Sequence, residues 1–142
     1  MAFTDRDRVR LYSGLSDSGR VSDELVDQRI ADAHADILRD LLPEYTASTD
    51  EMLVLAETEL STAYVLRSLA LASAYTERDH RSGDLTLRQR GRSAALAARA
   101  EVEERRAWGR LLPFLTRSAL PHKFVPVEPA EPGDDDWDAE DR

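Results

Sequence analysis

The stretch Ala63–Tyr75 carries a single charge, Arg67, and this apolar run places the strongest constraint on the fold. A helix that is apolar nearly all round is normally buried in a core. Ser48 or Thr49 can cap such a helix, and if it continues to about Thr76 it is roughly 40 Å long. The run therefore predicts a central core helix. The side chains expected to be buried in it include Leu60, Ala63, Tyr64, Leu71 and Ala74.

Two helices are expected before this core helix. Thr4 is the expected cap of a short N-terminal helix, which Gly14 ends. Ser22 is a good cap for a second helix, which ends before Pro43. Apolar residues recur in this second helix at every third or fourth position, which predicts one buried face. They are Val26, Ile30, Ala33, Ile37 and Leu41.

The last helix is expected from Thr86 to about Leu112, where Pro113 breaks or kinks it. Its small residues, Ala94–Ala98, allow another helix to approach closely. Together these patterns predict an all-α fold. We expect a small helical bundle over residues 1–118, with three main helices plus a short N-terminal one.

Residues 119–142 are expected to form an extended arm and then an acidic, disordered tail. Prolines 121, 126, 129 and 132 forbid a helix there. The chain has a formal net charge of −9. Because nucleic acid repels an acidic surface, DNA binding is not expected as the main activity. The arm and tail hold two basic residues, Lys123 and Arg142, and a larger number of acidic ones. The acidic residues are Glu128, Glu131, Asp134, Asp135, Asp136, Asp138, Glu140 and Asp141.

The residue pattern contains no recognisable catalytic, cofactor-binding or metal-binding motif. The chain has no cysteine, so disulfides and thiolate chemistry are excluded. His34 stands between Asp32 and Asp36, but residues two apart on a helix point in different directions, so we interpret it as a surface histidine. Asp134–Asp138 has the spacing of a calcium loop without its required glycine and final glutamate. We therefore expect no enzyme activity, cofactor, metal or membrane span.

Two features indicate contact with another protein. Residues 86–117 hold eight arginines against three acids, which suits docking on an acidic surface, although a solvated face is an equal alternative. The segment after Pro113 mixes apolar residues with prolines, and such segments become ordered on a partner unless they fold back on their own core. The candidate partner-binding residues are Leu111, Leu112, Phe114, Leu115, Phe124, Val125, Arg105, Arg106, Arg110 and Arg117.

The order of these features is similar to that of a known family. The chain opens with FTDRDRVRLYSGL at residues 3–15 and continues with VSDELVD at residues 21–27. IADAHADI at residues 30–37 and LPEY at residues 42–45 then precede the alanine- and leucine-rich core helix. Over about residues 3–118 this resembles the head–tail connector proteins of long-tailed double-stranded DNA viruses, also called adaptor or head-completion proteins. The acidic end after Gly133 has no counterpart in the resemblance.

The resemblance implies a structural virion protein at the head–tail interface, assembled in the host cytoplasm. Its partners would be copies of itself in a ring, with twelve as the expected number, the portal protein, and a tail or stopper protein. The ring would continue the DNA channel and lie close to packaged DNA without reading its sequence. The alternatives are another helical assembly factor, such as a small terminase subunit or a tail-assembly protein, and a small enzyme. A basic N-terminal helix-turn-helix would favour the terminase, but the N-terminal region is acidic.

Overall fold

The computed structural model describes residues 1–15, 19, 21–79 and 86–116, and for residues 77–79 and 86–90 it describes the backbone alone. These residues form α1 (Arg6–Ser13), α2 (Asp23–Asp40), α3 (Glu51–Asp79) and α4 (Thr86–Leu111). Single 3₁₀ turns follow at Pro43–Tyr45 and Leu112–Phe114. No strand occurs in the described ranges, so the predicted all-α bundle, with a short first helix, is confirmed. The proposed arm and tail, residues 119–142, lie outside those ranges.

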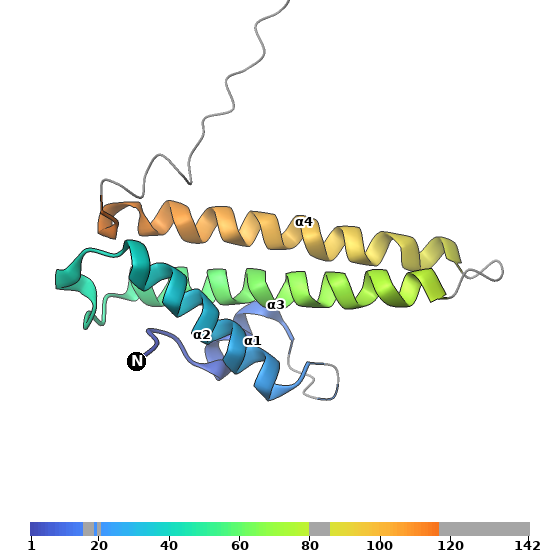
Figure 1. Ribbon diagram of the computed structural model, residues 1–142, viewed down its shortest axis with the longest axis horizontal. Helices are drawn as coiled ribbons and strands as arrows, with labels where there is room; N and C mark the ends of the chain where they lie inside the picture. Colours follow the sequence, from blue (N-terminus) through green and yellow to red (C-terminus); the bar gives the residue numbers. More distant parts are fainter. Residues whose placement is uncertain (16–18, 20, 80–85, 117–142) are drawn as a thin grey trace, which may run out of the picture.

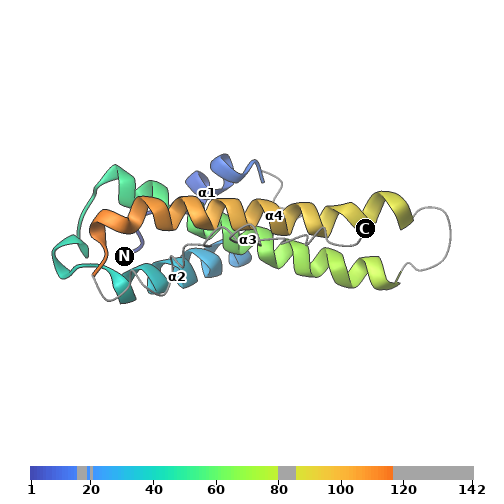
Figure 2. The ribbon, with the colours of Figure 1, turned by 90° about the horizontal axis from the view of Figure 1, so that it is seen from above.

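Helices α3 and α4 form a long antiparallel hairpin, which is the frame of the molecule (Figure 1). At 29 residues, α3 is about 43 Å long. Helices α1 and α2 pack on the side of α3 that faces mostly away from α4, and they cover only part of its length (Figure 1). Seen from above, the hairpin extends well beyond both of them (Figure 2). We call residues 71–79 of α3 and 86–96 of α4 the projecting end of the hairpin.

Local hydrogen bonds explain where the helices begin. The Ser22 hydroxyl accepts a bond of 3.2 Å from the Leu25 N–H, as predicted for the cap of α2. The cap of α1 is Asp5 rather than the predicted Thr4, because the Asp5 carboxylate accepts the bond from the Arg8 N–H. At the start of α3, the carboxylate of Asp50 accepts a bond of 2.8 Å from Met52 N–H, a role that we expected for Ser48 or Thr49.

The main core lies where α2, α3 and α4 meet. Its apolar side chains interlock around Trp108, which is only 7% exposed. The predicted stripe of α2 forms one wall of the core, from Ala33 to Leu41. The fully buried members on the other two helices are Leu53, Ala56, Leu60, Ala107 and Leu111. A second cluster joins α1 to α2 and α3 through Val9, Val21, Val26, Ile30 and Val65.

The prediction of the α3 core was correct at Leu60 and Ala63 but wrong at Leu71. Leu60 and Ala63 are fully buried, whereas Leu71 is 59% exposed. Tyr64 and Ala74 are half-buried. Leu71 is exposed because it lines an open groove between α2 and α3, where the two helices do not close over its side chain. The change Leu71→Asp is therefore not expected to abolish folding.

The segment after α4 folds back on the chain's own core. Leu42 N–H donates to the Phe114 carbonyl, and Thr116 N–H donates to the Asp40 carbonyl, each at 2.9 Å. The Phe114 ring also meets Tyr45 edge to face, with centroids 5.0 Å apart. Pro113 lies in a 3₁₀ turn that reverses the chain and buries Leu115. Of the two alternatives for the segment after Pro113, binding a partner or folding back on its own core, the structure shows folding back up to Thr116.

Candidate functional site

A run of polar residues in the middle of α3 is buried, and it marks the most distinctive site of the molecule. Glu57, Thr58, Glu59, Ser61 and Thr62 are each at most 4% exposed. Sequence reasoning missed this band because the apolar spacing of α3 drew attention away from it. The signal was present, since two glutamates lie inside a helix that was expected to form the core.

The Glu57 carboxylate joins α2 and the N-terminal segment to α3. One oxygen is 2.7 Å from Nδ1 of His34, and the other accepts a hydrogen bond from the Thr4 N–H. The Thr4 and Thr58 hydroxyls bond to each other at 2.7 Å, and the ring of Phe3 packs edge-on against His34. Burial raises the pKa of Glu57, while the bonds from Thr4 and His34 oppose that rise.

The interpretation of His34 as a surface histidine is therefore wrong. Its side chain is only 14% exposed, and it forms an ion pair or hydrogen bond with Glu57. The helical spacing correctly predicted that His34 does not face Asp32 or Asp36. Its partner, Glu57, lies 23 positions away on another helix. No local pattern in the sequence could reveal that pairing.

A second buried site contains two carboxylates, Glu59 and Glu103, and joins α1, α3 and α4. The Tyr12 hydroxyl donates to Glu103 at 2.8 Å and lies 3.3 Å from Glu59. Arg110 Nε donates to both oxygens of Glu59, at 3.0 and 3.1 Å. Burial, together with the neighbouring carboxylate of Glu103, raises the pKa of Tyr12 to about 12. Arg110, a candidate partner-binding residue, is thus used within the chain.

These buried groups fasten helices together. The partners of Glu57 and Glu59 described above all belong to the chain itself, and they come from the N-terminal segment and from α1, α2 and α4. A buried carboxylate without a donor is costly, so only a packing that supplies these donors is favourable. Among the described residues, no group of three or more potential ligands is placed to hold a metal ion.

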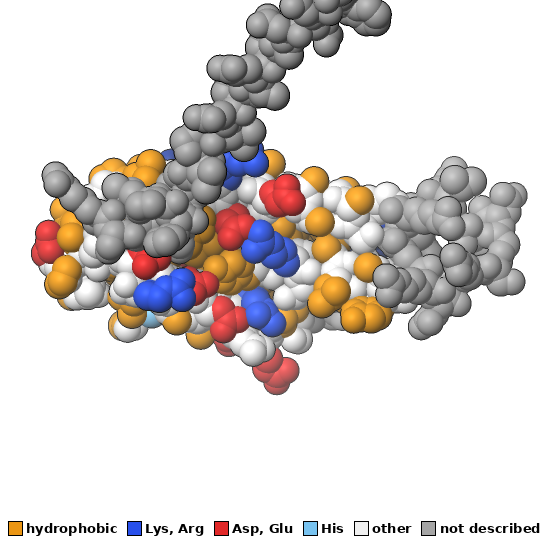
Figure 3. Space-filling view, turned by 45° about the horizontal axis from the view of Figure 1, so that its top comes forward, with side chains coloured by type: hydrophobic (Ala, Val, Ile, Leu, Met, Phe, Trp, Pro, Cys, Tyr) orange, Lys and Arg blue, Asp and Glu red, His pale blue; other side chains and the backbone are white. Residues whose placement is uncertain are grey.

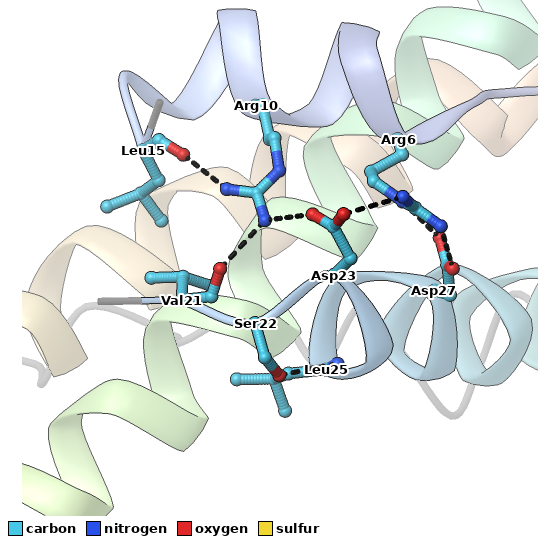
Figure 4. A network of polar contacts seen from close by, with 8 residues as sticks. All are labelled: Arg6, Arg10, Leu15, Val21, Ser22, Asp23, Leu25 and Asp27. Carbon is cyan, nitrogen blue, oxygen red and sulfur yellow. Dashed lines mark hydrogen bonds and ion pairs between the residues drawn. The ribbon is translucent and has the colours of Figure 1, made fainter. Parts of the chain in front are cut away.

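A more exposed network ties α1 to α2 (Figure 4). Arg6 bonds Asp23 and Asp27, with its Nε 2.8 Å from an Asp27 oxygen. Arg10 reaches Asp23 and donates to the Leu15 and Val21 carbonyls, at 2.9 and 2.7 Å. The bond from Arg6 lowers the pKa of the exposed Asp27. Arg10 therefore holds together the two ends of the loop between α1 and α2.

A surface groove of about 450 Å³ runs between α2 and α3. The Tyr64 hydroxyl, which lines the groove, donates to Asp36 at 2.6 Å, and burial raises the pKa of that hydroxyl. On its rim, Arg67 pairs with Glu104 of α4. Because each of these charges already has a partner in the chain, the groove has little net charge to offer a ligand. Its lining residues are Arg29, Asp32, Asp36, Tyr64, Arg67, Ser68 and Leu71.

The projecting end of the hairpin exposes an apolar surface. Leu71 is 59% exposed and Tyr75 is 63% exposed, and Ala72, Ala94 and Ala95 are exposed with them. Figure 3 shows apolar side chains towards this end of the hairpin, whereas the charged ones lie nearer the middle of the molecule and its other end. Among the described side chains of the projecting end, Arg92 is the one charged group.

The structure divides the candidate partner-binding residues into three groups. Leu111 and Leu115 are buried in the chain's own core, Phe114 packs against it and Arg110 bonds Glu59, so these four do not form a free docking arm. Leu112 is 38% exposed, and Arg105 and Arg106 are exposed on α4. Arg117, Phe124 and Val125 lie outside the described residues.

Comparison with protein-family models, with curated proteins and with solved structures finds no match to this chain. Of the helices that the structure describes, none combines the length and the hydropathy needed to cross a bilayer.

Proposed function

We propose that the chain is a structural subunit of a virus particle, which assembles with copies of itself into a ring and joins the portal to the tail. Support for the viral role comes from the sequence resemblance to head–tail connector proteins. Support for self-assembly comes from the apolar surface of the projecting end. In this role the ring would surround the DNA channel, with twelve copies as the expected number.

The exposure of Leu71 and Tyr75 is the observation that carries the proposal. Two helices alone cannot bury the sides of an apolar hairpin, and α1 and α2 leave its projecting end uncovered (Figures 1 and 2). A neighbouring copy could supply the missing layer. Burying a leucine completely contributes about 1.5–3 kcal/mol, and such contacts would repeat between each pair of copies in a ring.

The buried polar network supports the same proposal from a different direction. Glu57 and Glu59 bind groups from the N-terminal segment and from α1, α2 and α4, so the hairpin is held in a defined position against the rest of the bundle. A subunit that closes a ring needs such a fixed geometry, because small angular errors turn a closed ring into an open filament.

Electron microscopy tests the proposal. The full chain would be imaged in negative stain, alone and after mixing with a portal protein encoded near it in the same genome. We expect closed rings with a central opening, stacked coaxially on the portal in the mixed sample. Single chains in both samples at every concentration, or open filaments, would contradict the proposal.

A further inference from the structure

The outer face of α4 carries a regular stripe of arginines and small residues. The stripe lies on the solvent-exposed side of α4, each member has another three or four positions away, and all are exposed. We call it the arginine face of α4, and it consists of Arg92, Ala95, Ala98, Arg99, Val102, Arg105, Arg106 and Gly109. The small residues between the arginines leave room for a chain to approach the helix closely.

The arginine face has a surplus of positive charge. Arg99 and Arg106 share a single carboxylate, that of Glu103, at 3.8 Å each. That carboxylate is buried and also accepts a hydrogen bond from Tyr12. Glu104 is turned towards Arg67 of α3. Glu101 is then the one exposed carboxylate of α4 among the described side chains, set against four exposed arginines.

The strongest acidic sequence in the chain follows the same helix. The stretch from Glu128 to Asp141 contains eight carboxylates and no base. The described residues stop at Thr116, which the Asp40 carbonyl holds beside the C-terminal end of α4. From Thr116, an extended chain reaches Asp134 within about 60 Å. Arg92 lies only about 28 Å along α4 from Leu111, so the acidic stretch can reach every arginine of the face.

We propose that the arginine face of α4 is a docking surface for the chain's own acidic segment, residues 128–141. This inference goes beyond the proposed function and does not depend on it. Tethering gives the segment an effective concentration in the millimolar range at the face, which favours this occupant over any dilute acidic partner. The segment shields the arginines, so an acidic protein surface must displace it before binding. Because the attraction acts between exposed charges, it weakens as salt is added.

Paramagnetic relaxation measures this contact directly. The chain has no cysteine, so the change Ala139→Cys introduces a single site for a nitroxide spin label without altering the charge. At low salt, the label is expected to broaden the amide signals of α4 between residues 92 and 109. The broadening should disappear at high salt, and also when heparin is added as a competing polyanion.

Two double variants, each reversing the charge of two arginines, test whether the contact depends on the arginine face or on the overall charge of the protein. Arg92→Glu with Arg105→Glu should abolish the broadening, and neither change removes a group in contact with Glu103. The matched control is Arg8→Glu with Arg39→Glu, two exposed arginines on α1 and α2, which should leave the broadening in place. A circular dichroism spectrum shows that each variant is folded.

Three outcomes would overturn the inference. The first is broadening that is absent at low salt, and the second is broadening that survives reversal on the arginine face. The third is equal broadening when the spin label and the isotope label are on separate, mixed chains, because the occupant would then be a second copy. None of these results would affect the ring proposal, which rests on the projecting end of the hairpin.

Discussion

Glu57 is a carboxylate at the centre of the molecule, and its environment determines how stability depends on pH. Burial raises its pKa above that of an exposed glutamate. A carboxyl with a raised pKa in the folded state binds its proton more tightly there than in the unfolded chain. It therefore adds stability below the unfolded-state pKa, and this contribution is lost as pH rises through the folded-state pKa.

The change Glu57→Gln removes this titration. As pH rises from below the ordinary glutamate range to neutral, the unfolding free energy of the natural protein should fall relative to that of the variant. The difference amounts to about 1.4 kcal/mol for each unit by which the pKa is raised. Urea denaturation at a series of pH values measures it, with Glu24→Gln, at an exposed position of α2, as the control. If the unfolding free energies of Glu57→Gln and the natural protein change in parallel with pH, the pKa of Glu57 is not raised in the folded state.

Tyr12 contributes a hydroxyl that connects α1 to Glu103. Removing it with Tyr12→Phe leaves the buried carboxylate without its donor at 2.8 Å, which should lower the unfolding free energy by about 1–3 kcal/mol. The matched control is Tyr75→Phe, because Tyr75 is 63% exposed and its substitution should change little. Urea denaturation measures the unfolding free energy of both variants. Equal values for Tyr12→Phe and Tyr75→Phe would mean that the Tyr12 hydrogen bond does not stabilise the fold.

At the scale of elements, α3 has two parts with different surroundings. Up to Ala70 it contributes buried residues to clusters with α1, α2 and α4, whereas none of its side chains at residues 71–76 is buried. Local opening costs less where fewer apolar contacts are broken. Hydrogen exchange in the unassembled chain should therefore be faster at residues 71–76 than at residues 53–70. Uniform protection along α3 would contradict this division of the helix.

The elements were largely predictable because their signals are local. The cap at Ser22, the break at Pro113 and the apolar face of α2 each depend on residues within one or two turns. The exposure of Leu71 was not predictable, since it depends on how α2 lies against α3 in space. The Glu57–His34 pair was missed for the same reason. Of the candidate partner-binding residues, Arg105 and Arg106 are exposed, whereas Leu111 and Leu115 are buried in the core, which no local pattern revealed.

At the scale of the whole molecule, the bundle has a rigid part and an uncovered part. Buried carboxylates and their donors fix the four helices where they meet, and the hairpin then carries an apolar surface away from that centre (Figure 1). In the proposed ring, this surface is where neighbouring copies meet. A change there should affect assembly while leaving the fold intact, which separates it from changes in the core.

Sedimentation velocity of the natural chain and two single variants tests this claim most directly. Leu71→Asp places a charge on the projecting end, and Leu11→Asp places the same charge on α1, where the leucine is 85% exposed. Both variants should keep the helical content of the natural protein. With rising concentration, the natural chain and Leu11→Asp are predicted to form the same large species, while Leu71→Asp stays monomeric because a buried unpaired charge at the interface costs several kcal/mol. Assembly of Leu71→Asp to the same species at the same concentrations would contradict the account.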